Sequence, residues 1–280
     1  MHKTINSIVF LVPAMFDPEG FQFENWMINK AGRFPPLGAL FLSGYIKEKF
    51  SAMKLFIFDC NIELPFYLRG RENKRVNGKL VLDDLLEQYL LLVKPEVVCI
   101  TGQFHSVMHR VHELAETTRK ILPESAIVVG GAYPSTSHEM VLKDRNIDFI
   151  VLGEGEIRFE KLLNYLQGSL RENQLDGVLA AGEQTKTFPM GKEYVDLNKL
   201  PRIPLELIKY KEYAGVSSTR DNSYLYEMKI SMAMFVTRGC PNQCSYCNSG
   251  EFNYYGPKFR TTSIEKVIAD TIFYKENYGI

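Results

Sequence analysis

The sequence predicts a doubly wound α/β domain over residues 1–182, because short apolar segments alternate there with amphipathic ones. Continuous apolar strands separated by helices are typical of a parallel sheet that is covered on both faces. Glycine-rich turns after several of these segments support the same fold class. The predicted strands are Ile8–Val12, Lys54–Phe58, Val97–Thr101, Ala126–Val129 and Asp148–Leu152.

The predicted helices lie between these strands and after the last one. They cover residues 37–50, 80–93, 107–122 and 156–167. Within the second helix, apolar residues recur at helical spacing, which predicts an amphipathic helix. They are Leu80, Leu82, Leu85, Leu86, Tyr89, Leu90 and Val93. The first helix follows Pro35 and Pro36, which are tolerated at a helix start because the first N–H groups have no partner within the helix.

Composition limits the class of protein. The chain has 280 residues, 45% of them hydrophobic and 24% charged, with a formal net charge of zero. Its length allows one large or two ordinary domains. Neutrality gives no electrostatic reason to expect nucleic acid or an anionic membrane. No run approaches the roughly 18 apolar residues of a spanning helix, and the N-terminus has no signal-peptide core.

The five cysteines indicate a reducing compartment, so we expect a cytoplasmic protein. Cys60 and Cys99 lie in apolar, strand-like runs and are predicted to be small buried core residues. The other three occur together as Cys240-Pro-Asn-Gln-Cys244-Ser-Tyr-Cys247, after the apolar run Ile230–Val236.

This C-x3-C-x2-C spacing places three thiols in one loop, where they can bind one metal centre. Structural zinc sites use four ligands, and ordinary iron–sulfur clusters use four cysteines. Three cysteines therefore leave one iron of a cubane open to an outside ligand. A zinc loop that takes its fourth ligand from elsewhere in the chain is the alternative.

Arg238-Gly239 precedes the loop, Tyr246 lies before its last cysteine and Asn248 follows it. With these neighbours the loop resembles the signature of the radical S-adenosylmethionine (SAM) superfamily. The resemblance implies that the three cysteines hold three irons of a [4Fe-4S] cluster and that SAM binds the fourth. It also implies that the backbone at Tyr246 lies against the adenine, and that a flavodoxin or ferredoxin supplies the electron which cleaves SAM to a 5'-deoxyadenosyl radical.

Small residues gather where the predicted strands end, at the edge where open α/β sheets bind ligands. Glycine there lets a ligand approach the backbone, although tight strand-to-helix turns explain the same residues without a ligand. The candidate contacts are Thr101, Gly102, Gly130, Gly131, Ala132, Gly153, Glu154 and Gly155.

The order of these motifs, with Pro35-Pro-Leu-Gly38 and Asp59, resembles the radical SAM subfamily that carries an N-terminal, Rossmann-like cobalamin-binding domain. The resemblance implies that cobalamin binds at the strand ends. The loop 13–20 lacks the histidine of the D-x-H-x-x-G motif. Either cobalamin binds without a histidine ligand, or only the fold is kept. His105, just beyond the third strand, is interpreted as a surface or capping residue.

The predicted organisation is a cobalamin-binding-like domain (1–182), a linker (183–228) and the start of a TIM-type radical SAM barrel (229–280). The last part holds one strand, the cysteine loop and a helix over 263–277. That helix is predicted to bury Ile264, Val267, Ile268 and Ile272. A whole barrel needs about 200 residues or more. We therefore expect a fragment of a longer enzyme; a second chain that completes it is the alternative.

The resemblance implies a radical SAM enzyme that performs methyl transfer, rearrangement or cyclisation on a small molecule. Its relatives act on tetrapyrroles, hopanoids, antibiotics and other secondary metabolites. This chain alone is expected to be inactive, because the predicted barrel is incomplete. A cobalamin-binding module without catalysis and a structural zinc loop are the alternatives. No nucleic acid partner or membrane span is expected.

Overall fold

One six-stranded sheet forms the centre of the molecule, in the order β2-β1-β3-β4-β5-β6. The computed structural model describes residues 4–22, 34–69, 76–182, 193–213, 232–242, 244, 246 and 259–280. The first five strands are parallel and β6 is antiparallel to β5. The strands are β1 (Ser7–Val12), β2 (Lys54–Asp59), β3 (Val97–Thr101), β4 (Ala126–Gly130), β5 (Phe149–Val151) and β6 (Val178–Ala180).

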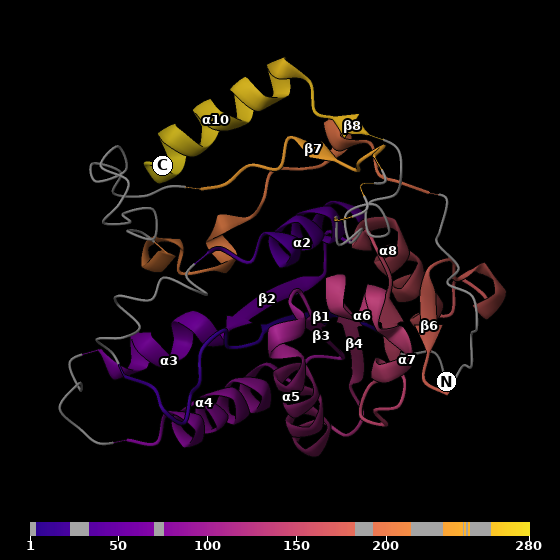
Figure 1. The fold of residues 1–280 in the computed structure, drawn as a ribbon. Helices are drawn as coiled ribbons and strands as arrows, with labels where there is room; N and C mark the ends of the chain where they lie inside the picture. The colour runs from indigo at the N-terminus through magenta and orange to yellow at the C-terminus, as the bar shows by residue number, and fades with distance from the viewer. Residues whose placement is uncertain are drawn as a thin grey trace.

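Helices cover both faces of the sheet, as predicted. Figure 1 shows α2 and α8 on one side of the strands and α4 and α5 on the other. The helices are α2 (Leu37–Lys49), α3 (Cys60–Leu68), α4 (Gly78–Val93), α5 (Met108–Ile121), α6 (Ala132–Thr136), α7 (His138–Val141) and α8 (Gly155–Leu166). Short 3₁₀ helices are η1 (His105–Val107), η2 (Glu172–Gln174), η3 (Leu197–Lys199), η4 (Leu205–Leu207) and η5 (Tyr210–Tyr213).

The central strand β1 shows why the sheet has two cores. Ile8 and Phe10 contribute to the core under α2 and α8, whereas Val9 and Leu11 contribute to the core under α4 and α5. Each of these side chains is at most 1% exposed. Successive side chains of a strand point to opposite faces, so a continuous apolar run supplies both cores.

The two isolated cysteines are buried as predicted, but Cys60 does not lie in a strand. It is the first residue of α3, because Asp59 ends β2 and caps the helix. The Asp59 carboxylate accepts a hydrogen bond from the backbone N–H of Asn61 at 2.9 Å. The interpretation of Cys60 as a strand residue was therefore wrong.

Residues 193–213, inside the predicted linker, pack against the outer side of α2. A Cβ added to Gly44 of α2 would lie 3.0 Å from the backbone oxygen of Arg202. Five apolar residues of this segment belong to the core under α2 and α8: Val195, Leu197, Leu200, Ile203 and Leu205. The described part of the linker thus extends the first core. The domain division at residue 182 stays a prediction.

The C-terminal segment contains a two-stranded antiparallel pair, β7 (Thr237–Arg238) with β8 (Arg260–Thr261), and α10 (Ile264–Tyr278). The strand predicted over the apolar run 230–236 is not found in its described part, 232–236. The β-structure begins directly after it, where the backbone of β8 supplies partners. Figure 1 shows α10 outside α2, beyond β7 and β8.

The predicted buried face of α10 is also wrong for three of its four residues, whereas Val267 is half-buried. Ile264, Ile268 and Ile272 are 73%, 53% and 49% exposed. The helix instead buries Asp270 and Tyr274, which contact the linker. The reason is that α10 is apolar on two sides, and the side carrying Tyr274 is the one that meets the linker. Within the described residues, no helix has the length and apolar character needed to cross a bilayer.

Candidate functional site at the strand ends and the cysteine loop

The carboxyl ends of the parallel strands meet at one edge of the sheet. Thr101 lies beside Gly130, and Gly130 beside Val151. The loops after β3 and β4 are bonded to each other here, because Gly102 N–H donates to Gly130 O at 2.7 Å. The strand order reverses between β1 and β3, and such a switch point is where open α/β sheets bind ligands.

Close backbone packing explains one of the predicted glycines without any ligand. Gly131 has a φ of +122°, which side chains rarely adopt. A Cβ at this position would lie 2.6 Å from Gly102 O. The pair Gly102 and Gly131 therefore lets two loops touch.

Other strand-end residues remain available to a ligand. Thr101, Gly130, Gly131, Ala132 and Gly155 are partly exposed, whereas Gly102, Gly153 and Glu154 are buried. At Gly130 the nearest atom to an added Cβ is Val151 O, at the ordinary distance of 3.7 Å. Packing thus does not require glycine at this position. Gly130 and Ala132 form the open part of the strand-end surface.

Ser135 on α6 joins the loops after β4 and β5. Its hydroxyl donates to Gly131 O at 2.6 Å and accepts from Gly153 N–H at 2.8 Å. One buried side chain thereby fixes two of the predicted glycine turns relative to each other. Sequence reasoning missed this residue, because a lone serine in a short helix carries no motif.

Three side chains joined by hydrogen bonds hold α6 in place. The hydroxyl of buried Tyr133 lies 2.9 Å from His112 Nε2, and His112 Nδ1 lies 2.6 Å from Asp144. Burial, and then the charge of Asp144, raise the pKa of Tyr133. These contacts position α6 and the strand end that precedes it. These contacts leave no pattern in the sequence, since the three residues come from separate elements.

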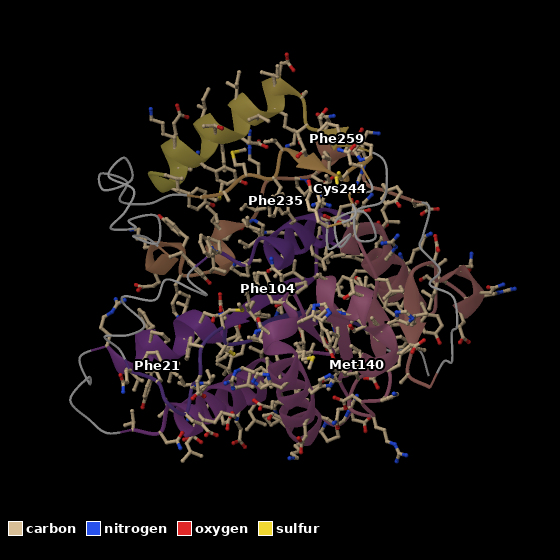
Figure 2. All side chains as sticks on the ribbon, viewed as in Figure 1. Phe21, Phe104, Met140, Phe235, Cys244 and Phe259 are labelled. Carbon is tan, nitrogen blue, oxygen red and sulfur yellow. The ribbon has the colours of Figure 1, made fainter. Side chains whose placement is uncertain are left out.

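The loop after β3 carries exposed apolar and polar side chains. Phe104 and Met108 are 47% and 37% exposed, and Figure 2 labels Phe104 near the centre of the molecule. His105 is exposed, as expected, and its Nε2 lies 3.0 Å from Thr136 Oγ1 and 3.2 Å from Ser137 Oγ. That nitrogen already has partners within the protein.

Both carboxylate oxygens of Asp59, at the end of β2, already accept hydrogen bonds within the protein. Tyr213 of η5 donates its hydroxyl proton to the carboxylate at 2.6 Å, and Asn61 donates to the other oxygen. Burial raises the pKa of Asp59 to about 6, although the hydrogen bonds from Tyr213 and Asn61 oppose the shift. This residue therefore fastens the linker to the sheet.

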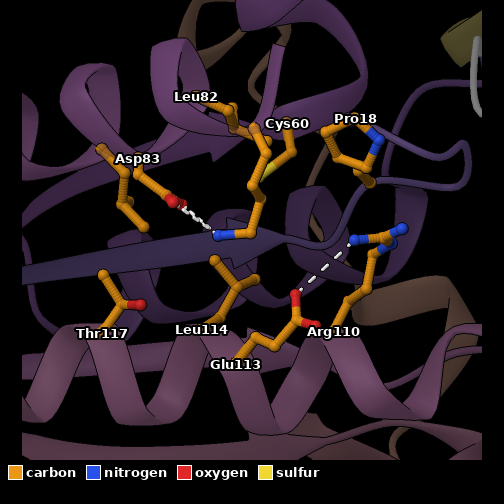
Figure 3. A pocket seen from close by; sticks show the side chains of 11 residues that line it. Pro18, Cys60, Leu82, Asp83, Arg110, Glu113, Leu114 and Thr117 are labelled. Atoms are coloured by element: carbon orange, nitrogen blue, oxygen red, sulfur yellow. Dashed lines mark hydrogen bonds and ion pairs between the residues drawn. The ribbon is translucent and has the colours of Figure 1, made fainter. Parts of the chain in front are cut away.

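A small pocket lies beside the loop after β1, between α4 and α5 (Figure 3). Its lining includes Pro18 and Cys60, together with the ion pairs Lys79–Asp83 on α4 and Arg110–Glu113 on α5, at 2.6 and 3.5 Å. Its volume of about 20 Å³ holds roughly one water molecule. It is too small for a cofactor.

The cysteine loop is only partly within the described residues. Cys240 is half-buried, Cys244 is exposed, and neither forms a disulfide. Tyr246 is 90% exposed, and Cys247 lies outside the described residues. Among the residues that are described, no three His, Cys, Asp or Glu side chains gather as a metal site. The predicted third ligand is not among them.

Two arginines, one buried and one partly buried, connect this loop to the strand ends. Arg238 of β7 forms ion pairs with Glu156 at 2.8 Å and with Glu154 at 3.7 Å. Arg260 of β8 also binds Glu154, with one contact at 3.1 Å. Glu154 was predicted to contact a ligand, but its carboxylate is occupied by these arginines. The sequence motifs contain Arg238 and Glu154 but do not include Arg260, and they do not indicate that these residues pair.

The family model of the B12-binding domain matches residues 27–163. This segment is similar to B12-binding domains. It contains the strand-end surface described above, and the sheet order is the one expected for such a fold.

Curated relatives extend the similarity beyond this domain. The cytidylyl-2-hydroxyethylphosphonate methyltransferase of Streptomyces wedmorensis is 23% identical over 220 residues, which cover 71% of this chain and 40% of that protein. The anaerobic magnesium-protoporphyrin IX monomethyl ester cyclase of Synechocystis sp. is 28% identical over 163 residues, 58% of this chain and 30% of that protein. The chain thus spans well under half the length of these relatives.

Solved structures share the fold. The cobalamin-dependent SAM radical enzyme OxsB, with aqua-cobalamin and SAM bound, matches 99% of this chain and 33% of its own with a TM-score of 0.68 at 17% identity. The radical SAM methyltransferase TsrM of Kitasatospora setae, with cobalamin and a [4Fe-4S] cluster bound, matches 98% of this chain and 46% of its own with a TM-score of 0.59 at 14% identity. These two structures therefore share the fold of this chain, including its segment similar to B12-binding domains.

The residues present fit the cofactors of this family. The open backbone at Gly130 and the exposed ring of Phe104 suit a broad, partly apolar ligand at the strand ends. Cys240 and Cys244 are free thiols, the donor type that iron–sulfur clusters use. No described residue supplies a histidine in the loop after β1.

Proposed function

We propose that this chain is part of a cobalamin-binding radical SAM enzyme that acts on a small molecule by methyl transfer, rearrangement or cyclisation. The observation that carries the proposal is the attachment of the C-x3-C-x2-C loop to a B12-binding domain. Arg238, two residues before Cys240, is ion-paired at the carboxyl edge of that domain's sheet. The similar curated proteins include a methyltransferase and a cyclase.

In this proposal the residues of the chain have separate tasks. Cys240, Cys244 and Cys247 hold the cluster as thiolates, and the backbone at Tyr246 positions the adenine of SAM. The partly exposed strand-end residues, Gly130 among them, carry cobalamin. When bound, the cluster and SAM supply a 5'-deoxyadenosyl radical, and cobalamin supplies or accepts a methyl group.

Within this scheme the protein's own contribution is orientation. The hydroxyl of Ser135 fixes two strand-end turns, and the Glu154–Glu156 loop holds the strand that leads into the cysteines. Residues 1–182, 183–228 and 229–280 remain our proposed division. A flavodoxin or ferredoxin is the proposed electron donor.

A cobalamin-binding module without catalysis is the second candidate function. It is favoured by one observation: the family match ends at residue 163, before the cysteine loop. This candidate predicts stoichiometric binding of hydroxocobalamin together with no dependence on iron.

Anaerobic reconstitution with iron and sulfide tests the proposal directly. We expect about four irons per chain and an electron paramagnetic resonance (EPR) signal of the reduced protein that changes when SAM is added. Zinc without sulfide would support a structural zinc loop. A protein that binds hydroxocobalamin and holds no metal would support the binding module.

A further inference from the structure

The buried charges beside the cysteine loop form a cluster of four residues, Arg238, Arg260, Glu154 and Glu156. Arg238 and Arg260 lie directly opposite each other in the β7–β8 pair. Like charges across a strand pair repel each other. Their side chains are only 7% and 12% exposed, so water cannot screen this repulsion, and the pair needs acidic partners.

The acidic partners come from the start of α8, at the end of β5. The side chains of Glu154 and Glu156 are 3% and 5% exposed. Carboxylates at this end of a helix are favoured by its dipole. Glu154 pairs with both arginines and Glu156 with Arg238. The cluster therefore has two negative and two positive members, one pair from the B12-binding domain and one pair from the C-terminal segment.

Aromatic side chains complete the surroundings of Arg238. Its guanidinium lies 5.5 Å from the centre of the Phe41 ring on α2, which suits a cation–π contact. Phe41 in turn stacks on Phe235, with ring centres 6.1 Å apart. The arginine is thus held by α8 through charge and by α2 through an aromatic face.

A continuous series of contacts runs from the strand ends to the cysteines. Ser135 bonds to Gly131 and to Gly153, and Gly153 is followed by Glu154. The carboxylates of α8 then hold Arg238, and two residues further along the chain is Cys240. Every step in this series is either a bond within the chain or a contact between described residues.

We propose that the Arg238–Arg260–Glu154–Glu156 cluster is a positioning device, which sets the place of the cysteine loop relative to the cobalamin-binding strand ends. The proposal rests on the proposed function, because it assigns a role to the spacing of two cofactor sites. Replacing buried ion pairs by apolar residues often costs no stability. The ion pairs at this junction therefore fix the position of the cysteine loop more than they raise the free energy of unfolding.

The test compares four variants of the full chain. Glu156→Gln and Glu154→Gln remove one charge each and keep the side-chain shape. Arg238→Lys keeps the charge and tests rescue. Glu160→Gln is the matched control, because Glu160 lies one turn further along α8 and bonds to Tyr45 instead of the arginines.

The first readout is the rate of iron loss and the EPR spectrum of the reconstituted protein. We expect Glu156→Gln and Glu154→Gln to assemble the cluster but to lose iron to a chelator about tenfold faster and to show a smaller SAM-induced change in EPR. Arg238→Lys should lie between these variants and the wild type, and Glu160→Gln should match the wild type. Identical chelation rates and EPR spectra in all variants would overturn the proposal.

The second readout is hydrogen exchange of the metal-free chain, which does not depend on the cluster. The β7 and β8 amides should exchange about tenfold faster in Glu156→Gln, with no change in Glu160→Gln. If the wild type binds no iron, the proposed function fails. The hydrogen-exchange rates of the β7 and β8 amides then decide by themselves whether the charge cluster positions this segment. Unchanged exchange would reject it whatever the iron content.

Discussion

The α/β part and the C-terminal segment of this chain are held in place by different forces. Strand β1 is buried on both faces between two layers of helices, so apolar burial stabilises the first part. In the second part, α10 leaves Ile264, Ile268 and Ile272 half exposed or more. It is attached to the linker by the buried Tyr274 ring and by polar contacts: Arg202 with Asp270 at 2.8 Å, and Ile203 N–H with the Tyr274 hydroxyl at 2.7 Å.

This difference separates folding from function. The part with the complete core carries the strand-end surface, whereas the part with the exposed helix carries the proposed cluster ligands. Changes in the first part should act on stability, and changes in the second should act on metal content. The following predictions test that separation, beginning with the largest effect.

The largest expected effect is loss of iron from the cysteine variants. Cys240→Ala or Cys244→Ala should remove nearly all iron and sulfide after reconstitution, because a three-cysteine cluster has no spare ligand. Cys99→Ala is the control: its thiol is buried in β3, and burial raises its pKa well above the usual value. Equal iron content in Cys240→Ala and the wild type would contradict the assignment.

Core truncations should show the second largest effect and separate the two parts directly. Leu90→Ala removes a side chain with no exposed surface and should lower the free energy of unfolding by about 3 kcal/mol. Ile268→Ala alters a side chain that is 53% exposed and should cost less than about 1 kcal/mol. Urea unfolding measures both. Similar costs would show that the outer face of α10 is covered.

Asp59 should make stability depend on pH. Its pKa is raised from 3.8 to about 6 in the folded chain, chiefly by burial, so the folded state binds the proton more tightly than the unfolded state. The resulting stabilisation is complete below about pH 4 and is lost as pH rises through about 6.

Asp59→Asn removes this titration. The unfolding free energy of the wild type minus that of Asp59→Asn should therefore fall by up to about 3 kcal/mol between about pH 4 and about pH 7. Urea unfolding across this range provides the measurement. A difference that does not vary with pH would show that the carboxyl has an ordinary pKa.

The smallest effect separates packing from ligand binding at two neighbouring glycines. Gly131→Ala should destabilise the chain by about 2 kcal/mol, since its φ of +122° and its contact with Gly102 exclude a side chain. Gly130→Ala should stay within about 1 kcal/mol of the wild type and weaken binding of hydroxocobalamin. Absorbance titration checks this, and unchanged binding would place the ligand elsewhere.

Most of the sheet was predictable from sequence because its strands are apolar runs that fill two cores. The strands β1 and β3 begin and end within one residue of their predicted limits. Helices α3, α6 and α7 were missed, since they are short; α3 also depends on its local cap, Asp59. The antiparallel direction of β6 was not predicted either, because direction depends on the connection and leaves no mark in a three-residue strand.

The site was predictable only where one loop or one motif contains it. The cysteines lie within eight residues, so their spacing was enough to predict a shared metal site. The strand-end glycines were predictable because they follow apolar runs. The contacts of Ser135 and the pairing of Arg238 with Glu156 join residues that are far apart in the chain. Only the folded topology brings them together. The orientation of α10 was wrong for a related reason, since both of its sides are apolar and only the partner decides between them.

The antiparallel strand β6 has a consequence for the shape of any self-sufficient piece of this chain. It pairs Val178 with Val151 and Ala180 with Phe149, and so carries the backbone away from the edge where the strand ends lie. The following described segment crosses the outside of α2 at Gly44 and is fastened by the Tyr213–Asp59 bond. A fragment cut at residue 182 would lose the segment 193–213 and expose the outer side of α2. A fragment ending at Tyr213 would retain that segment.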